Sequence, residues 1–344
     1  MREALKQLIF GTRRISQWRA VGIEGPSRPF RLWLEDETGR ADVTGSSSVA
    51  ALRPVTFAIH AGDRISRSAL EKNRLDLRVR PVAEKAYPIG EMLETPGTSV
   101  GKEARHTDWV GEIALRYLRD VGTDVASISL FTVAGHRNRS LLPADYFRFR
   151  LRQRWDMFRD KTPYNFRMIP SELFALYVFY YVPRPVYLVS VAFEGATNIF
   201  PMDLVGRTGG DLFLMALRCT SPAIRLMTRS KQLALTAVPF DEKDVAYELG
   251  KHHKKETIDW DALPFRRVLS PVFGLQVPAS ALGILEVEVV ATDQIATHVL
   301  FVTKIVREER WRAGRQLFHI PGILREYLTS VAPSATAGQE IEGL

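Results

Sequence analysis

The residues best suited to bind an anion lie in one short stretch, Arg218 to Ser221, followed directly by Pro222. Arg218 offers a forked guanidinium, and Thr220 and Ser221 offer hydroxyl groups. A helix expected from Pro222 to Ser230 would add free backbone N–H groups and the positive end of its dipole. These groups together could hold a phosphate. The alternative is an ordinary capped helix preceded by an exposed arginine, and the residues alone leave both interpretations open.

Other residue types that often carry chemistry offer weaker signals. His252 and His253 are adjacent, so they cannot both reach one metal ion from a regular element, and we expect no metal site there. The single cysteine, Cys219, excludes an internal disulfide framework and a zinc site built on several thiolates. We interpret it as a packed residue, or as one that supports the turn without contacting the ligand, rather than as a nucleophile. The glycine-rich residues 206–210 match neither a Walker loop nor a dinucleotide fingerprint.

Composition is typical of a soluble globular protein and does not select a partner. The 344 residues favour two domains, and 46% of them are hydrophobic and 25% charged. The net charge of +8 would suit nucleic acid, acidic lipid or a phosphate-bearing cofactor. The longest apolar run, residues 173–182, is about half of what a bilayer span needs. The N-terminus lacks the pattern of a secretory signal, and the single cysteine favours a cytoplasmic location.

Strands are expected through most of the N-terminal region, which resembles no family. Apolar alternation and turn residues predict strands at 29–34, 41–44, 55–60, 75–82 and 125–133, with a hairpin-like break at 36–39. A helix is expected from Asp108 to Val121, with Asp108 as its cap and Gly122 as its stop. A second helix is expected over 242–253. The sequence shows no internal repeat.

The segment 147–155 alternates apolar residues with arginines. Phe147, Phe149, Leu151 and Trp155 would lie on one side of a strand, and Arg148, Arg150, Arg152 and Arg154 on the other. Pro143, a few residues earlier, could equally begin a helix. Aromatic residues and arginines can together bind single-stranded nucleic acid. Strict alternation separates the two kinds of side chain, however, so we expect no nucleic-acid binding here.

Residues 183–301 carry an ordered set of features. A strand at 184–193 and a turn at 194–196 are followed by Asn198-Ile-Phe-Pro201, a strand at 212–218, and Thr297-His298-Val-Leu-Phe301. This order resembles the flavin reductase-like FMN-binding split barrel, the family that includes flavoredoxin, over about residues 170–310. The resemblance implies an α+β, mainly β fold, with a split β-barrel over 166–325. An unassigned strand-rich N-terminal domain would precede it over 1–165, joined near 161–171, and a disordered tail would follow over 326–344.

The resemblance also implies which residues contact the cofactor. Asn198, Pro201, Met202, Asp203 and Leu204 would lie along the isoalloxazine ring of FMN, and Arg218, Thr220 and Ser221 would hold its phosphate. Relatives carry Thr or Ser at the position of Ala223, so Arg225 or Lys231 would have to compensate. His298 would be the catalytic residue, beside the flavin and the nicotinamide. A purely structural histidine is the alternative.

The activity that the resemblance implies is reduction of bound FMN by NAD(P)H, with hydride transfer to the flavin N5. The family also implies a homodimer and an oxygenase or other electron-accepting partner, with no membrane attachment. The alternative is a non-catalytic protein that holds flavin or another cofactor on the same fold. The choice between NADH and NADPH, and the role of residues 1–165, are open at this point.

Overall fold

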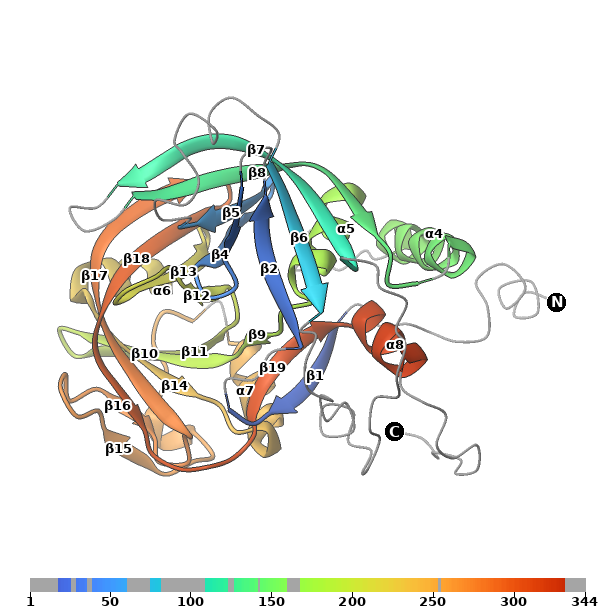
Figure 1. Cartoon of the computed structure of the whole chain (residues 1–344). Helices are drawn as coiled ribbons and strands as arrows, with labels where there is room; N and C mark the ends of the chain where they lie inside the picture. The colour runs from blue at the N-terminus through green and yellow to red at the C-terminus, as the bar shows by residue number, and fades with distance from the viewer. Residues whose placement is uncertain are drawn as a thin grey trace, which may run out of the picture.

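The computed structural model describes residues 18–25, 29–35, 39–60, 75–81, 109–122, 127–141, 143–159, 168–252 and 255–331. Two seven-stranded antiparallel sheets dominate it, accompanied by a three-stranded and a two-stranded sheet (Figure 1). The α+β, mainly β fold class is confirmed. The predicted break at 36–38, most of the predicted linker, His253 and the tail beyond 331 lie outside the described residues.

The first large sheet contains the N-terminal strands, in the spatial order β3-β2-β6-β7-β8-β5-β4. Their bounds are β2 (Phe30–Glu35), β3 (Arg40–Asp42), β4 (Ser47–Leu52), β5 (Val55–Ile59), β6 (Leu75–Pro81), β7 (Gly111–Gly122) and β8 (Ser127–Asn138). In β2 the buried residues Phe30, Leu32 and Leu34 stand two apart, which is the period of a half-buried strand. The strands predicted at 29–34, 41–44, 55–60, 75–82 and 125–133 are confirmed.

Two predicted elements in this half need correction. The helix expected over 108–121 is wrong, because β7 occupies these residues and pairs with β6 on one side and β8 on the other. Ile113 and Leu115, two residues apart, are both buried, as a strand requires. The strand expected over 147–155 is also wrong, since helix α4 (Pro143–Arg159) covers it. Phe149 and Gln153, four apart, are buried while Phe147 is exposed, so the helical period decides.

The second large sheet contains the strands of the C-terminal half, in the order β11-β10-β14-β17-β18-β13-β12. Their bounds are β10 (Tyr187–Phe193), β11 (Ala196–Met202), β12 (Val205–Arg207), β13 (Leu212–Arg218), β14 (Gln232–Ala237), β17 (Gly283–Ile295) and β18 (His298–Arg310). Helix α6 (Ala223–Ser230) connects β13 to β14, and α7 (Lys243–Gly250) follows β14. The predicted strands and both predicted helices of this half are confirmed within a few residues.

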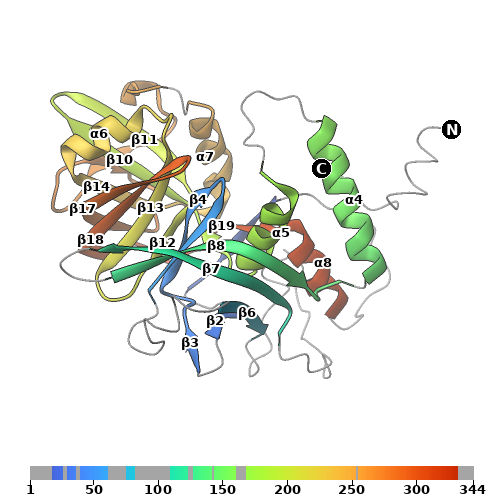
Figure 2. The same ribbon diagram turned by 90° about the horizontal axis from the view of Figure 1, so that it is seen from above.

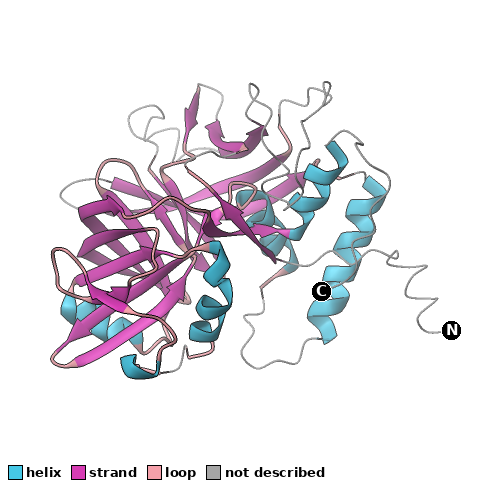
Figure 3. Ribbon diagram, turned by 90° about the horizontal axis from the view of Figure 1, so that it is seen from below, coloured by secondary structure: helices cyan, strands magenta, loops and turns pink. Residues whose placement is uncertain are grey.

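Short strands connect the beginning and the end of the described chain. Strand β1 (Trp18–Ile23) pairs with β19 (Gln316–Pro321), which also pairs with β9 (Arg184–Pro185). Strands β15 (Arg267–Leu269) and β16 (Gln276–Pro278) form the small hairpin beside the barrel. Helices α4, α5 (Pro170–Phe179) and α8 (Gly322–Val331) gather on one side of the molecule, away from the second sheet (Figures 2 and 3). Residues 326–331, expected in a tail, therefore belong to a helix.

The two faces of the second sheet are buried against different partners. Phe213 and Met215 of β13 point into the interior of their own barrel, together with Leu235 and Val287. The alternate residues of β13, Leu212, Leu214 and Ala216, belong instead to the largest core, which also contains the N-terminal sheet. The apolar run 173–182 joins this same core, mostly as α5. Among the described residues, no helix combines the length and apolarity needed to cross a membrane.

Candidate functional site

Backbone hydrogen bonds define the turn between β13 and α6. Arg218 ends the strand and is half-buried, whereas Cys219 and Thr220 are exposed. The Ser221 N–H donates to the Arg218 carbonyl at 2.9 Å, and the Cys219 N–H donates to the Thr297 carbonyl at 3.0 Å. These bonds fix the turn directly before α6. Arg218, Thr220 and Ser221 therefore lie between the end of β13 and the first turn of α6.

His298 lies directly beside Arg218, because the two residues are partners in the β13–β18 ladder. Its side chain is 0% exposed, and its Nδ1 lies 3.0 Å from the Thr297 hydroxyl. Burial, together with the positive charge of Arg218, lowers the pKa of His298 to about 4. The imidazole is therefore neutral at physiological pH. It can orient neighbouring groups by hydrogen bonding, and it does not carry an ionisable proton for acid catalysis at that pH.

The N-terminal half reaches this site through a backbone carbonyl. The Thr297 hydroxyl donates to the carbonyl of Arg53 at 3.2 Å. Arg53 is exposed and stands in the turn between β4 and β5. Arg53, Thr297 and Cys219 thus form a continuous chain of hydrogen-bonded neighbours, and no local motif predicts this connection.

Arg225 and Lys231, the two residues expected to compensate for Ala223, lie at different places along α6. Ala223 is 3% exposed and packs in the barrel core, where a hydroxyl would have to be buried. The Arg225 Nε donates to a Glu256 carboxylate oxygen at 2.7 Å, so this cation already has a partner. Lys231 follows the last residue of α6, where it adopts a left-handed conformation with φ of 58°. It lies at the opposite end of the helix from Ser221, and the structure does not bring it to the turn from Arg218 to Ser221.

Most side chains predicted to line the flavin ring have other roles in the fold. The Asn198 amide donates to the carbonyls of Lys255 at 3.1 Å and Glu256 at 2.8 Å, which fixes the loop after α7. Met202 is buried in the barrel core, and Pro201 is half-buried in β11. Leu204 is buried in the core shared with the N-terminal half. The side chains of Asn198, Met202 and Leu204 are therefore committed to the fold.

Asp203 belongs to a polar cluster that sequence reasoning missed. Its carboxylate lies 3.3 Å from the Arg184 guanidinium and 2.8 Å from Nδ1 of His319. The other imidazole nitrogen of His319 lies 3.1 Å from the Tyr247 hydroxyl. Burial acts to raise the pKa of the Asp203 carboxyl, but Arg184 and His319 more than offset it, so the pKa is held well below its usual value. The four residues come from distant parts of the chain, and no local motif signals them.

Arg184 is held in this cluster by aromatic rings. Its guanidinium carbon lies 4.1 Å from the ring centroid of Trp18 and 4.5 Å from that of Tyr180. Cations over aromatic faces are attracted by the ring quadrupole, more strongly where water is excluded. Because Trp18 is in β1 and Asp203 follows β11, the arginine connects the beginning of the described chain to the barrel.

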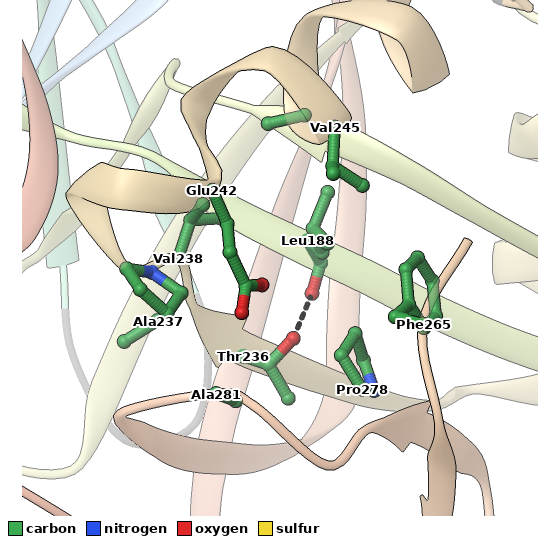
Figure 4. A pocket seen from close by; sticks show the side chains of 11 residues that line it. Leu188, Thr236, Ala237, Val238, Glu242, Val245, Phe265, Pro278 and Ala281 are labelled. Carbon is green, nitrogen blue, oxygen red and sulfur yellow. Dashed lines mark hydrogen bonds between the residues drawn. The ribbon is translucent and has the colours of Figure 1, made fainter. Parts of the chain in front are cut away.

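An apolar crevice lies elsewhere, between α7 and the barrel (Figure 4). It is partly open to solvent and has room for no more than about one water molecule. Its polar groups are already engaged: the Thr236 hydroxyl donates to the Leu188 carbonyl at 3.3 Å, and the Ser280 hydroxyl donates to Glu242 at 2.7 Å. None of the predicted cofactor residues lines it, so we interpret it as a packing crevice. Within the described part of the chain, no group of three or more His, Cys, Asp or Glu side chains could hold a metal ion.

Comparison with known proteins identifies a domain within the second half. The model of the flavin reductase like domain matches residues 179–320. No curated protein matches the chain.

Among solved structures, an FMN-binding protein from Thermus thermophilus with bound p-hydroxybenzaldehyde is 24% identical, with a TM-score of 0.34, over 38% of this chain and 73% of that one. The NADH:FAD oxidoreductase of Streptomyces globisporus is 17% identical, with a TM-score of 0.39, over 46% of this chain and 95% of that one. Flavoredoxin from Methanosarcina acetivorans is 17% identical, with a TM-score of 0.34, over 38% and 69%. At these scores the similarity does not assign a ligand to this chain.

Proposed function

Residues 179–320 belong to the flavin reductase-like family, and from this premise we propose that the protein is a flavin-dependent oxidoreductase whose C-terminal barrel binds FMN. When bound, FMN would supply N5 as the acceptor of a hydride from NAD(P)H. The observation that carries the proposal is the turn from Arg218 to Ser221 at the N-terminus of α6, inside the matched domain.

The groups of this turn fit a phosphate monoester. The Arg218 guanidinium can donate two parallel hydrogen bonds to phosphate oxygens, and the Thr220 and Ser221 hydroxyls can donate one each. The N-terminus of α6 adds the positive end of its dipole, although the Ile224 N–H already donates to the Ser221 carbonyl at 3.3 Å. Alanine at position 223 lacks the hydroxyl that relatives carry there, and the other groups of the turn would hold the phosphate.

The ring would be contacted by backbone groups rather than by the predicted side chains. The side chains of Asn198 and Asp203 are committed to the fold, whereas backbone N–H and C=O groups complement the neutral edge of a flavin. His298 is fully buried, so we propose that it positions Arg218 and the phosphate turn instead of contacting the nicotinamide.

Binding and reduction can be tested separately. We expect the purified protein to bind FMN, and we expect NADH or NADPH to bleach the bound flavin under anaerobic conditions. Arg218→Gln should weaken FMN binding by about 10- to 100-fold, because a charge-assisted hydrogen bond contributes about 1.5–3 kcal/mol. Arg229→Gln, at the other end of α6, is the matched control and should change affinity less than twofold.

Three results would redirect the proposal. Flavin that stays oxidised with both nucleotides would favour the alternative, a non-catalytic cofactor-binding protein. An Arg218→Gln variant with unchanged affinity would remove the phosphate role of this turn. Failure to bind either FMN or FAD would overturn the proposed function as a whole.

The resemblance further implies an oxygenase or other electron-accepting partner and a homodimer. We propose the partner on that basis alone. A reduced-flavin transfer assay tests it: a monooxygenase component that depends on free reduced flavin should turn over when this protein and NAD(P)H are supplied.

A further inference from the structure

The two large sheets have the same strand order. The first runs β3-β2-β6-β7-β8-β5-β4 and the second β11-β10-β14-β17-β18-β13-β12. If the seven strands of each half are numbered along the chain, both sheets read second, first, fifth, sixth, seventh, fourth, third. Each of the corresponding neighbouring pairs is antiparallel. A shared order this far from sequential does not arise from simple hairpins, so the halves have one topology.

The residue-by-residue register repeats as well. In the β7–β8 hairpin Gly111 pairs with Asn138, and in the β17–β18 hairpin Gly283 pairs with Arg310, both 172 positions further along. Every pair of the first hairpin becomes a pair of the second under this same shift. Both irregularities of the ladder coincide too: those at 114/115 and 117/119 fall on 286/287 and 289/291. Bulges are specific features of a strand pair, so their coincidence is strong evidence of a repeated fold.

The remaining ladders extend the correspondence to the edge of each sheet. Under the shift of 172 positions, Thr303 is the counterpart of Phe131. Phe57 pairs with Phe131 and Phe213 pairs with Thr303, so Phe57 is the counterpart of Phe213. On the neighbouring strand, Ser48 pairs with Ala58 as Gly206 pairs with Leu214, so Ser48 is the counterpart of Gly206. The connections are similar in length: residues 60–74 join β5 to β6, and residues 219–231 join β13 to β14.

These counterpart residues meet where the two halves touch. Strand β4 packs against β12, and also against β13 and β18. A Cβ atom on Gly206 would lie 2.9 Å from the Ser48 Cβ and 2.9 Å from the Ser47 carbonyl oxygen. In an isologous interface, a residue on the two-fold axis contacts its own equivalent. The contact between Ser48 and Gly206 therefore marks a pseudo-two-fold axis between the halves.

We propose that residues 30–138 are a second copy of the barrel topology and pair with the flavin reductase-like barrel within one chain. The N-terminal copy takes the place of a second subunit, so the protein works as a monomer, in contrast to the homodimer that the resemblance implies. It also supplies one wall of the candidate site. This last part rests on the proposed function, whereas the internal pairing does not.

Contacts between the two halves beside the candidate site support the proposal that the N-terminal copy forms one of its walls. The Arg53 carbonyl accepts from Thr297, which neighbours His298 and the phosphate turn. At the next turn, a Cβ on Gly209 would lie 3.0 Å from the His60 ring, so the loop between β12 and β13 is in close contact with the N-terminal half. The exposed guanidinium of Arg53 is the added cation that this wall offers to an anionic cofactor.

The repeat does not extend to the phosphate-binding residues. Since Ile59 is the counterpart of Met215, the shift that relates β5 to β13 places Arg218 on Gly62. The hairpin shift places His298 on Ala126. Both positions are outside the described residues, and their identities alone show that the arginine and histidine occur in one half. We therefore expect one flavin per chain.

Two measurements on the full chain test the proposal. Sedimentation equilibrium from about 1 to 100 μM should give a single species of 38.9 kDa; a stable dimer across this range would overturn the monomer. In FMN titrations the expected stoichiometry is one per chain, and Arg53→Gln should weaken binding at least about fivefold. Arg40→Gln, on the edge strand opposite β4, is the matched control and should bind like the wild type.

The outcomes separate the two proposals. If Arg53→Gln binds FMN as tightly as the Arg40→Gln control, the N-terminal copy supplies no wall and that part is wrong. If the wild type binds no flavin, the proposed function fails together with the wall. The sedimentation mass still decides whether one chain contains the complete pair.

Discussion

The cluster around Asp203 gives the most direct test of how the barrel is held to the rest of the chain. We consider Asp203→Asn, which keeps the size of the side chain and removes its charge. The Arg184 side chain is 10% exposed and that of Asp203 is 28% exposed. The substitution would leave the arginine charge with two aromatic faces and no carboxylate.

The expected loss of stability is set by this burial. Removing one partner of a fully buried ion pair costs about 3–5 kcal/mol, because the other charge stays buried without compensation. The partial exposure of Asp203 lets water replace some of the lost interaction. We therefore expect the free energy of unfolding to fall by about 2–3 kcal/mol at pH 7.

The pH dependence follows from the lowered pKa of Asp203. A carboxyl whose folded pKa lies below its unfolded value, about 3.9, stabilises the protein fully above that value. The contribution is lost as the pH falls through the folded pKa. The difference between wild type and Asp203→Asn should accordingly be as large at pH 5 as at pH 7, and should shrink only in stronger acid.

Urea unfolding measures the difference, provided that the wild type and the variants share the same m-value. Asp211→Asn is the control, because its pair with Lys304 is about half exposed on both sides and should contribute less than about 1 kcal/mol. A loss below about 1 kcal/mol for Asp203→Asn at pH 7 would refute the reasoning. So would a difference that has already disappeared at pH 5.

Three further predictions concern other parts of the structure. The pKa of His298 is lowered to about 4, so between about pH 6.5 and 4 the unfolded chain binds a proton that the folded chain does not. Acidification over this range should therefore lower the free energy of unfolding by up to about 3 kcal/mol. His298→Gln should remove this part of the pH dependence of stability measured by urea unfolding. His136→Gln should remove a similar part, since burial, with Arg150, lowers its pKa to about 4 as well; an unchanged slope in both variants would contradict the assignment. Gly206→Val should cost about 1–3 kcal/mol in thermal or urea unfolding by overpacking against β4, while Gly39→Val, whose Cβ would meet nothing within 4 Å, should be nearly neutral. Arg225→Gln should change both stability and FMN affinity little, because its exposed pair with Glu256 is largely solvated; an effect as large as that of Arg218→Gln would place Arg225 at the phosphate.

The sequence was informative where a local pattern decides the structure. Alternation in β2 and the turn residues around it were sufficient to predict a strand, and the segment from Arg218 to Pro222 predicted the strand–turn–helix that the structure contains. The helix expected over 108–121 failed because the signals at its ends, Asp108 and Gly122, outweighed the alternation of Ile113 and Leu115. Pairing with β6 and β8, a tertiary effect, determines that segment.

Interactions between distant residues could not be read from the chain. Asp203 and His319 meet only because β9, β19 and the end of β11 converge. The repeated topology was equally hidden, since the counterparts conserve register and burial rather than residue type. Ile113 corresponds to Leu285, and Ser48 to Gly206, so a search for identical residues finds little. The repeat resides in backbone hydrogen bonds, which side-chain patterns specify only loosely.

The contact between Ser48 and Gly206 has a consequence for how such an interface can change. On a true two-fold axis a residue meets a copy of itself, so any substitution enlarges or shrinks both sides at once. Within one chain the two positions are encoded separately. One position can therefore keep its side chain while the other becomes glycine and leaves room for it. A symmetric dimer cannot do this, because both positions hold the same residue. Dilution cannot separate the fused halves either, so their pairing does not depend on how much protein the cell makes.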